Sequence, residues 1–119
     1  MLFPLAIRGH VDHKIANKAG KLMLLANRDF ECAFYEDLPY SYRLRDASER
    51  YLRKRIYNKM KISLEPYYIC SDNFYNIIKN LTEMYKSQLD EEILNQIRSY
   101  AFRIGGGSKG CERIWCYER

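Results

Sequence analysis

Apolar side chains recur at helical spacing in four stretches of this chain, and short runs of β-forming residues separate these stretches. We expect helices over residues 12–27, 46–61, 72–84 and 90–104, and strands over residues 2–7, 30–35, 62–70 and 111–117. The resulting order is β-α-β-α-β-α-α-β, in which helices predominate. This order predicts one α+β domain over residues 1–119, with about four helices packed on a small mixed sheet.

The spacing also predicts which side of each helix packs on the core. In the second helix Leu52, Ile56 and Met60 recur every four residues, and Asp46 with Glu49 forms a capping box before them. The first helix is expected to bury Ile15, Ala19, Leu22, Met23 and Ala26, and the third to bury Phe74, Ile77, Ile78, Leu81 and Met84. These stripes should together form the core of the domain.

Composition places the chain among ordinary globular proteins, because 47% of its residues are hydrophobic and 29% are charged. No run approaches the ~18 apolar residues of a membrane span. The apolar start, residues 1–7, lacks the basic residues and the cleavage site of a signal peptide. We therefore expect a cytoplasmic protein without membrane contact. In that reducing compartment its four cysteines would be buried thiols, namely Cys32, Cys70, Cys111 and Cys116.

Positive charge is concentrated in residues 40–61. Eight Lys and Arg side chains there oppose two acidic ones, which gives a net charge of +6 against +5 for the whole chain. Helical spacing puts one set of residues on a single face of the second helix, away from the predicted core stripe: Arg50, Arg53, Lys54, Tyr57 and Lys61. Arg43 and Arg45 extend this set toward the N-terminus. The segment is typical of a surface for a polyanion.

Cations on such a face would contact phosphates, and Tyr57 would stack on a base. We therefore predict a small binding protein that docks this face on nucleic acid or a nucleoprotein, without a cofactor, and acts by occupancy as a regulator or inhibitor. Two other interpretations stay open. The same cations suit an acidic groove of a protein partner, in the manner of inhibitors encoded by phages or mobile elements. A solvated helix face also needs no partner at all.

His10 and His13 are the only histidines, and they lie at a predicted strand-to-helix junction. Two imidazoles can serve as base and acid in metal-independent RNA cleavage, so a small ribonuclease is the enzymatic alternative. Asp12 beside them has a simpler role as a helix cap, and too few ligands lie nearby to predict a metal site. The chain also lacks the motifs of serine hydrolases, zinc proteases and dinucleotide-binding enzymes. An enzyme is therefore the less favoured prediction.

Three further residues are weaker candidates for binding. Arg103 and Lys109 flank a glycine-rich loop that follows a helix and precedes a strand, which is the reverse of the order in a P-loop. Trp115, the only tryptophan, would anchor the core or, if exposed, form a binding hot spot. A tyrosine-rich strand edge would also be able to pair with a second copy, so the sequence leaves a homo-oligomer open.

Overall fold

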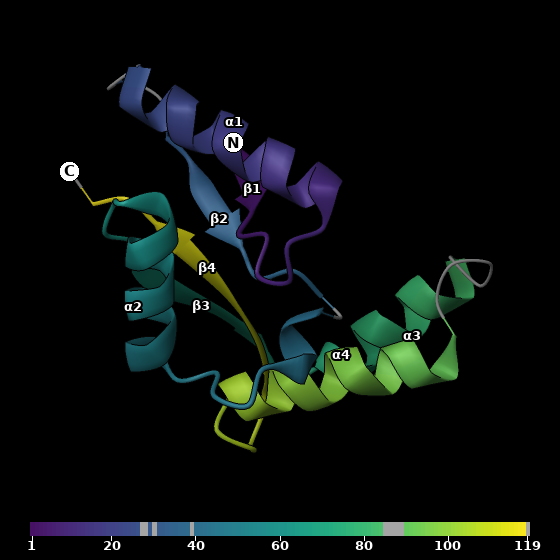
Figure 1. The fold of residues 1–119 in the computed structure, drawn as a ribbon. Coiled ribbons are helices and arrows are strands. Elements are labelled where there is room, and N and C mark those ends of the chain that lie inside the picture. Colours follow the sequence, from purple (N-terminus) through teal and green to yellow (C-terminus); the bar gives the residue numbers. More distant parts are fainter. Residues whose placement is uncertain (27–28, 30, 39, 85–89, 119) are drawn as a thin grey trace. The chain divides into compact units, whose positions relative to one another are not determined.

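The computed structural model describes residues 1–26, 29, 31–38, 40–84 and 90–118. In this part of the chain four α-helices and four β-strands follow one another in the predicted order, with a short 3-10 helix added after the second strand (Figure 1). The elements are β1 (Leu2–Pro4), α1 (Val11–Ala26), β2 (Ala33–Tyr35), η1 (Tyr40–Arg43), α2 (Glu49–Met60), β3 (Glu65–Ser71), α3 (Phe74–Met84), α4 (Glu91–Ile104) and β4 (Gly110–Cys116). The predicted α+β class is confirmed.

The four strands form one mixed sheet in the order β1-β2-β4-β3. β1 pairs in parallel with β2, in the register Phe3 with Phe34, and α1 provides the crossover that a parallel pair requires. β2 pairs antiparallel with β4, which sets Phe34 opposite Trp115. These two rings lie on one face of the sheet, and neither is exposed to solvent.

The chain divides into two compact units. Unit 1 comprises residues 1–67 and 113–119, and unit 2 comprises residues 68–112, so that β3 and β4 run through both. Each unit has a hydrophobic cluster of its own. The interpretation of residues 1–119 as one domain stays a prediction.

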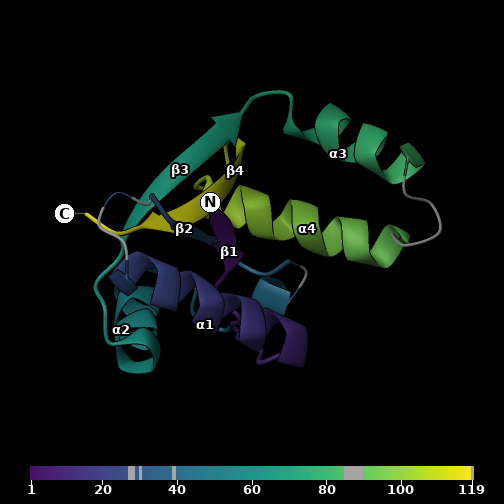
Figure 2. The same ribbon diagram turned by 90° about the horizontal axis from the view of Figure 1, so that it is seen from above.

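The core of unit 1 lies between the sheet and the two helices α1 and α2, which cover the same face of the sheet (Figure 2). The buried side chains of this core are Leu5, Ile7, Leu24, Cys32, Phe34, Leu44, Leu52, Ile56, Met60, Ile62, Leu64 and Trp115. The predicted core stripe of α2 is thus correct. No helix among the described residues is long and apolar enough to cross a membrane.

The predicted core stripe of α1 is wrong for four of its five residues, since only Met23 is partly buried and packs against the core. This helix buries Asn17, Gly20 and Leu24, whereas Ile15 and Leu22 face solvent. The reason is a close approach between α1 and β1. A Cβ on Gly20 would lie 2.5 Å from Cγ of Phe3, and Nδ2 of Asn17 donates a 2.9 Å hydrogen bond to the carbonyl of Pro4. Only a residue without a side chain permits this packing.

Unit 2 is a helical hairpin of α3 and α4 whose core contains Phe74, Ile78, Leu94 and Ala101. Ile77 and Met84 of the predicted α3 stripe are exposed, and the side chain of Leu81 lies outside the described residues. A disulfide joins Cys70 on β3 to Cys111 on β4, with the Cα atoms 4.0 Å apart. The prediction of four thiols is therefore wrong for this pair, because the strand pairing brings together two residues that are 41 positions apart. Cys32 and Cys116 are free thiols.

Candidate polyanion interface on helix α2

Helix α2 carries most of the candidate residues, and local sequence signals define its ends. Ser48 is the N-cap, and its hydroxyl accepts a 3.3 Å hydrogen bond from the backbone N–H of Tyr51. The predicted cap, Asp46, instead accepts a 2.8 Å hydrogen bond from the backbone N–H of Ser48. At the other end Lys61 adopts the left-handed conformation, with φ of 59°, and stops the helix.

Four exposed side chains of the predicted set lie along the outward side of α2, those of Arg50, Lys54, Tyr57 and Lys61. Their spacing places them on one side of the helix, opposite the buried stripe. None of the four side chains makes a hydrogen bond or an ion pair with another described residue. Their polar groups are therefore available to a ligand. Arg43 in η1 and Arg45 after it are also exposed, and their role as an extension of this face stays a prediction.

Helical spacing predicts Arg53 on the same face, but its side chain forms ion pairs with two carboxylates of the protein. Its guanidinium lies 2.5 Å from Oε1 of Glu65 on β3 and 3.6 Å from Oε2 of Glu49 one turn earlier. The hydrogen bond to Glu65 is the main cause that raises the pKa of Arg53. The charge of Arg53 is thus largely offset by carboxylates, and one of these comes from a strand that the helix spacing does not reveal.

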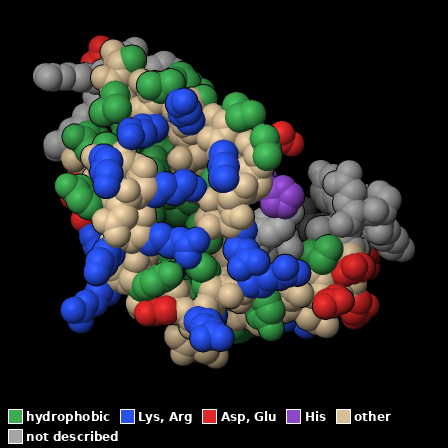
Figure 3. Space-filling model, viewed as in Figure 1, with side chains coloured by type: hydrophobic (Ala, Val, Ile, Leu, Met, Phe, Trp, Pro, Cys, Tyr) green, Lys and Arg blue, Asp and Glu red, His purple; other side chains and the backbone are tan. Residues whose placement is uncertain are grey.

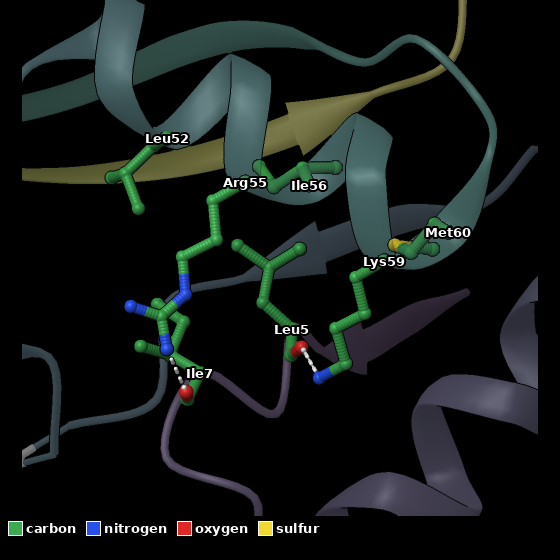
Figure 4. A pocket seen from close by; sticks show the side chains of 7 residues that line it. All are labelled: Leu5, Ile7, Leu52, Arg55, Ile56, Lys59 and Met60. Carbon is green, nitrogen blue, oxygen red and sulfur yellow. Dashed lines mark hydrogen bonds between the residues drawn. The ribbon is translucent and has the colours of Figure 1, made fainter.

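Two further cations of α2, Arg55 and Lys59, bind the loop between β1 and α1. Nη2 of Arg55 donates a 2.7 Å hydrogen bond to the carbonyl of Ile7, and Nζ of Lys59 donates a 3.0 Å hydrogen bond to the carbonyl of Leu5 (Figure 4). Nζ of Lys59 also donates to the carbonyl of Ala6 at 2.7 Å. This loop has an unusual backbone, because Ala6 adopts the left-handed conformation with φ of 56°. The two cations therefore hold a strained loop in place.

A small pocket of about 10 Å³ lies between these two side chains and the apolar residues beneath them (Figure 4). Its lining consists of Leu5, Ile7, Leu52, Arg55, Ile56, Lys59 and Met60. This volume has room for about one water molecule. Burial here lowers the pKa of Lys59, although the nearby Asp37 acts in the opposite direction. The pocket is thus a packing feature of the loop and offers no room for a substrate.

Asp37 binds the same loop from another side. Its carboxylate is 1% exposed and accepts a 2.7 Å hydrogen bond from the backbone N–H of Ile7. Burial is the main cause that raises the pKa of Asp37. Nδ1 of His13 lies 3.6 Å from Oδ2 of Asp37, and the ring centres of His10 and His13 are 5.8 Å apart. The structure therefore brings both predicted histidines together and adds a carboxylate beside them.

Sequence reasoning missed Asp37 because it lies in a predicted turn, far along the chain from both histidines. The run Glu36-Asp37-Leu38-Pro39 has the composition of a solvated turn. The burial of Asp37 depends on the parallel pairing of β1 with β2, which brings the residues after β2 against the loop after β1. No local signal reports that pairing.

The secondary candidates lie elsewhere. Trp115 is fully buried, and its indole N–H donates a 2.8 Å hydrogen bond to Oε1 of Glu36. Arg113 forms an ion pair with the same carboxylate and lies over the indole ring. Trp115 is thus a core residue and is not an exposed hot spot. Arg103 and Lys109 are exposed in unit 2, whereas α2 belongs to unit 1.

The excess positive charge belongs to unit 1. Its sequence contains fifteen Lys and Arg against nine Asp and Glu, whereas unit 2 contains five against six. Lys and Arg side chains gather over α1 and α2 on the face shown in Figure 3. Helix α1 contributes Lys14, Lys18 and Lys21, which sequence reasoning did not single out. Unit 1 therefore presents a broader basic surface than the second helix by itself predicts.

No group of three or more His, Cys, Asp and Glu side chains within the described ranges is arranged to hold a metal ion. Comparisons with family models, with curated proteins and with solved structures found no match.

Proposed function

We propose that this protein binds single-stranded nucleic acid through the outward face of α2 and acts by occupying it. The observation that carries this proposal is the division of cations around the helix. Arg53, Arg55 and Lys59 contact other groups of the protein, whereas Arg50, Lys54 and Lys61 extend into solvent as one row. A row of uncommitted cations on one side of a rigid helix suits a phosphate backbone.

Tyr57 favours nucleic acid over an acidic protein as the ligand. Its side chain is 53% exposed and lies between Lys54 and Lys61 along the row. An exposed aromatic ring among cations can stack on an unpaired base, and stacking tolerates any base. From Arg50 to Lys61 the row is ~16 Å long, which matches the length of about five nucleotides of one strand.

Fluorescence anisotropy with labelled single-stranded RNA, single-stranded DNA and duplex DNA tests the proposal. The double variant Arg50→Glu, Lys54→Glu should lose binding to the single strands, because it reverses two charges of the row. Lys79→Glu changes a charge in the same way at an exposed position of α3 in unit 2 and should bind like the wild type. Circular dichroism of each variant should show an unchanged fold.

Two results would decide against this function. Wild-type binding by the double variant would exclude the outward face of α2 as the interface. No binding to any of the three nucleic acids at low salt would favour an acidic groove of a protein partner, where the same cations would serve.

The geometry around His13 favours a ribonuclease as the second candidate function. Nδ1 of His13 lies 3.6 Å from Oδ2 of the buried Asp37, and in a cleavage reaction this carboxylate would orient the ring so that Nε2 exchanges a proton with the substrate, as in other histidines oriented by a carboxylate. One imidazole would take the proton of the 2′-hydroxyl while the 2′-oxygen attacks phosphorus and the bond to the 5′-oxygen breaks. The second imidazole, His10, would give a proton to that leaving oxygen.

The length of the RNA after incubation with the protein distinguishes a ribonuclease from a protein that only binds nucleic acid. Cleavage requires a 2′-hydroxyl, so RNA should shorten and DNA of the same sequence should not. His13→Ala should abolish shortening and leave the affinity for DNA unchanged. RNA that keeps its full length during prolonged incubation would exclude the ribonuclease.

A further inference from the structure

Helix α1 presents an apolar stripe to solvent. The side chains of Val11, Ile15, Leu22 and Leu25 are 69%, 65%, 57% and 61% exposed. On a helix these positions fall on one side, opposite Asn17, Gly20 and Leu24, which pack on the sheet. Exposed aliphatic side chains are common singly, but a row of four along one helix marks an interaction site.

The spacing of the stripe fits another helix. With Lys18 included, its members follow one another at intervals of four, three, four and three residues. This alternation is the seam of a two-helix coiled coil, in which such residues insert between those of the facing helix. An extended peptide presents every second side chain to its binding site, and that spacing does not match the spacing of this stripe.

The charges on α1 define the chemistry of the partner. Lys18 is exposed and lies at the centre of the stripe, with Val11 seven residues before it and Leu25 seven residues after it. Lys14 and Lys21 lie along one flank of the stripe, and the other flank carries Asp12, Ala19 and Ala26. A facing helix must therefore place a carboxylate opposite Lys18 and further acidic residues along one side.

A second copy of this chain does not meet that requirement. Because the stripe is centred on Lys18, two α1 helices in register place Lys18 against Lys18, whether they run parallel or antiparallel. The antiparallel arrangement also brings Lys14 of one copy toward Lys21 of the other. Like charges at a buried seam oppose association.

A lipid surface is also a poorer fit. Helices that lie in a membrane interface usually carry aromatic side chains and have cations on both sides of the apolar face. Helix α1 contains no Phe, Tyr or Trp, and its lysines occupy the centre and one flank only.

We propose that the exposed face of α1 binds one amphipathic, acidic helix of a partner protein, with Lys18 paired to a carboxylate at the centre of the seam. This site is on α1, whereas the row of cations proposed to bind nucleic acid is on α2. The protein would then join a nucleic acid to a helical partner.

The test uses two labelled helical peptides about three heptads long, with leucine at the seam positions and glutamate along one flank. One peptide has glutamate at the central seam position, and the other has lysine there. In fluorescence anisotropy with the full chain, the glutamate-centred peptide should bind at least about tenfold more tightly than the lysine-centred one.

Variants of the protein make the test specific. Lys18→Glu should reverse the preference between the two peptides, because the attractive and the repulsive pair exchange places. Leu22→Ala should weaken both peptides, and the exposed position of Leu22 means that the fold should survive. Lys54→Glu, the same charge change on α2, should leave peptide binding intact while it weakens binding of nucleic acid.

Four outcomes would overturn the proposal. These are no binding of the glutamate-centred peptide, equal binding of both peptides, and a Lys18→Glu variant that keeps the wild-type preference. The fourth is that the stripe binds something else, either a second copy of the chain or a lipid surface. Sedimentation would show self-association, and a vesicle assay would show binding to phosphatidylserine. In either case, loss of that binding in Leu22→Ala would assign it to the stripe.

Discussion

The salt dependence of RNA binding should show how many cations of residues 40–61 contact phosphates of the RNA. For single strands the logarithm of the affinity falls with the logarithm of the salt concentration, with a slope of about −0.7 for each phosphate neutralised. Four cations of the segment are exposed and make no hydrogen bond or ion pair with another described residue, namely Arg43, Arg50, Lys54 and Lys61. Arg45 is also exposed but interacts with another group of the protein, so it is not counted. If each of these four cations neutralises one phosphate, the slope is about −2.8. If all eight cations of the segment did so, the slope would be about −5.6.

This difference is large enough to measure. Between about 50 and about 200 mM salt the first slope lowers the affinity for RNA about 50-fold, and the second lowers it about 2,000-fold. Anisotropy titrations of single-stranded RNA at four or more salt concentrations provide the slope. A slope near the higher value would refute the assignment of Arg55, Lys59 and Arg53 to structural roles.

Two neighbouring residues of α2 provide a matched pair for the same assay. Lys54→Gln removes an uncommitted cation and should make the slope shallower by about 0.7. Arg53→Gln removes a cation that Glu65 and Glu49 already offset, so the slope should change little. Equal effects of the two substitutions would show that the ion pairs of Arg53 open when RNA binds, and the count of four would then be wrong.

Three further predictions concern stability. Cys70→Ser should lower the free energy of unfolding by about 4 kcal/mol in the chain-entropy model, because the disulfide with Cys111 closes a loop of 41 residues, and urea titrations with and without reductant measure this loss. Gly20→Ala should cost about 1–3 kcal/mol in thermal unfolding, because its Cβ would meet the ring of Phe3, and an unchanged melting temperature would contradict the close approach of α1 to β1. Burial raises the pKa of Asp37 above 3.8, so the stability of the wild type relative to Asp37→Asn should be greatest below pH 3.8 and should decline as the pH rises through the raised pKa; urea titrations of both proteins across this range test the sign.

The sequence predicts the elements of the fold well because their signals are local. The stripe Leu52, Ile56 and Met60 marks the buried side of α2, and all three side chains are buried. In α1 the same reasoning fails, because apolar residues occur on both sides of the helix. The choice between the sides depends on Gly20, whose missing side chain admits Phe3 of another element. The spacing of apolar residues indicates that a helix is amphipathic. It does not indicate which side of the helix a neighbouring element of the fold will pack against.

The candidate site is predicted in part for the same reason. Helical spacing correctly places Arg50, Lys54 and Tyr57 on an exposed face of α2. It does not reveal that Glu65 on β3 meets Arg53, because that contact depends on the packing of α2 against the sheet. The loop carbonyls that Arg55 and Lys59 bind are likewise about fifty residues earlier in the chain. Charge is a property of the sequence, but the availability of each charge depends on tertiary contacts.

The cations of α2 acquire different roles because each residue turns the side chain by about 100° around the helix axis. Arg55 and Lys59 are one turn apart and share the flank that faces the β1–α1 loop, so they bind carbonyls there. Arg53 lies on the opposite flank and meets β3. The remaining cations of α2, Arg50 and Lys54, are exposed and make no hydrogen bond or ion pair with another described residue. A single run of basic residues therefore secures the loop, ties the helix to the sheet and leaves a row of exposed charge. For this reason a count of charges along the sequence overstates the charge that is available for binding.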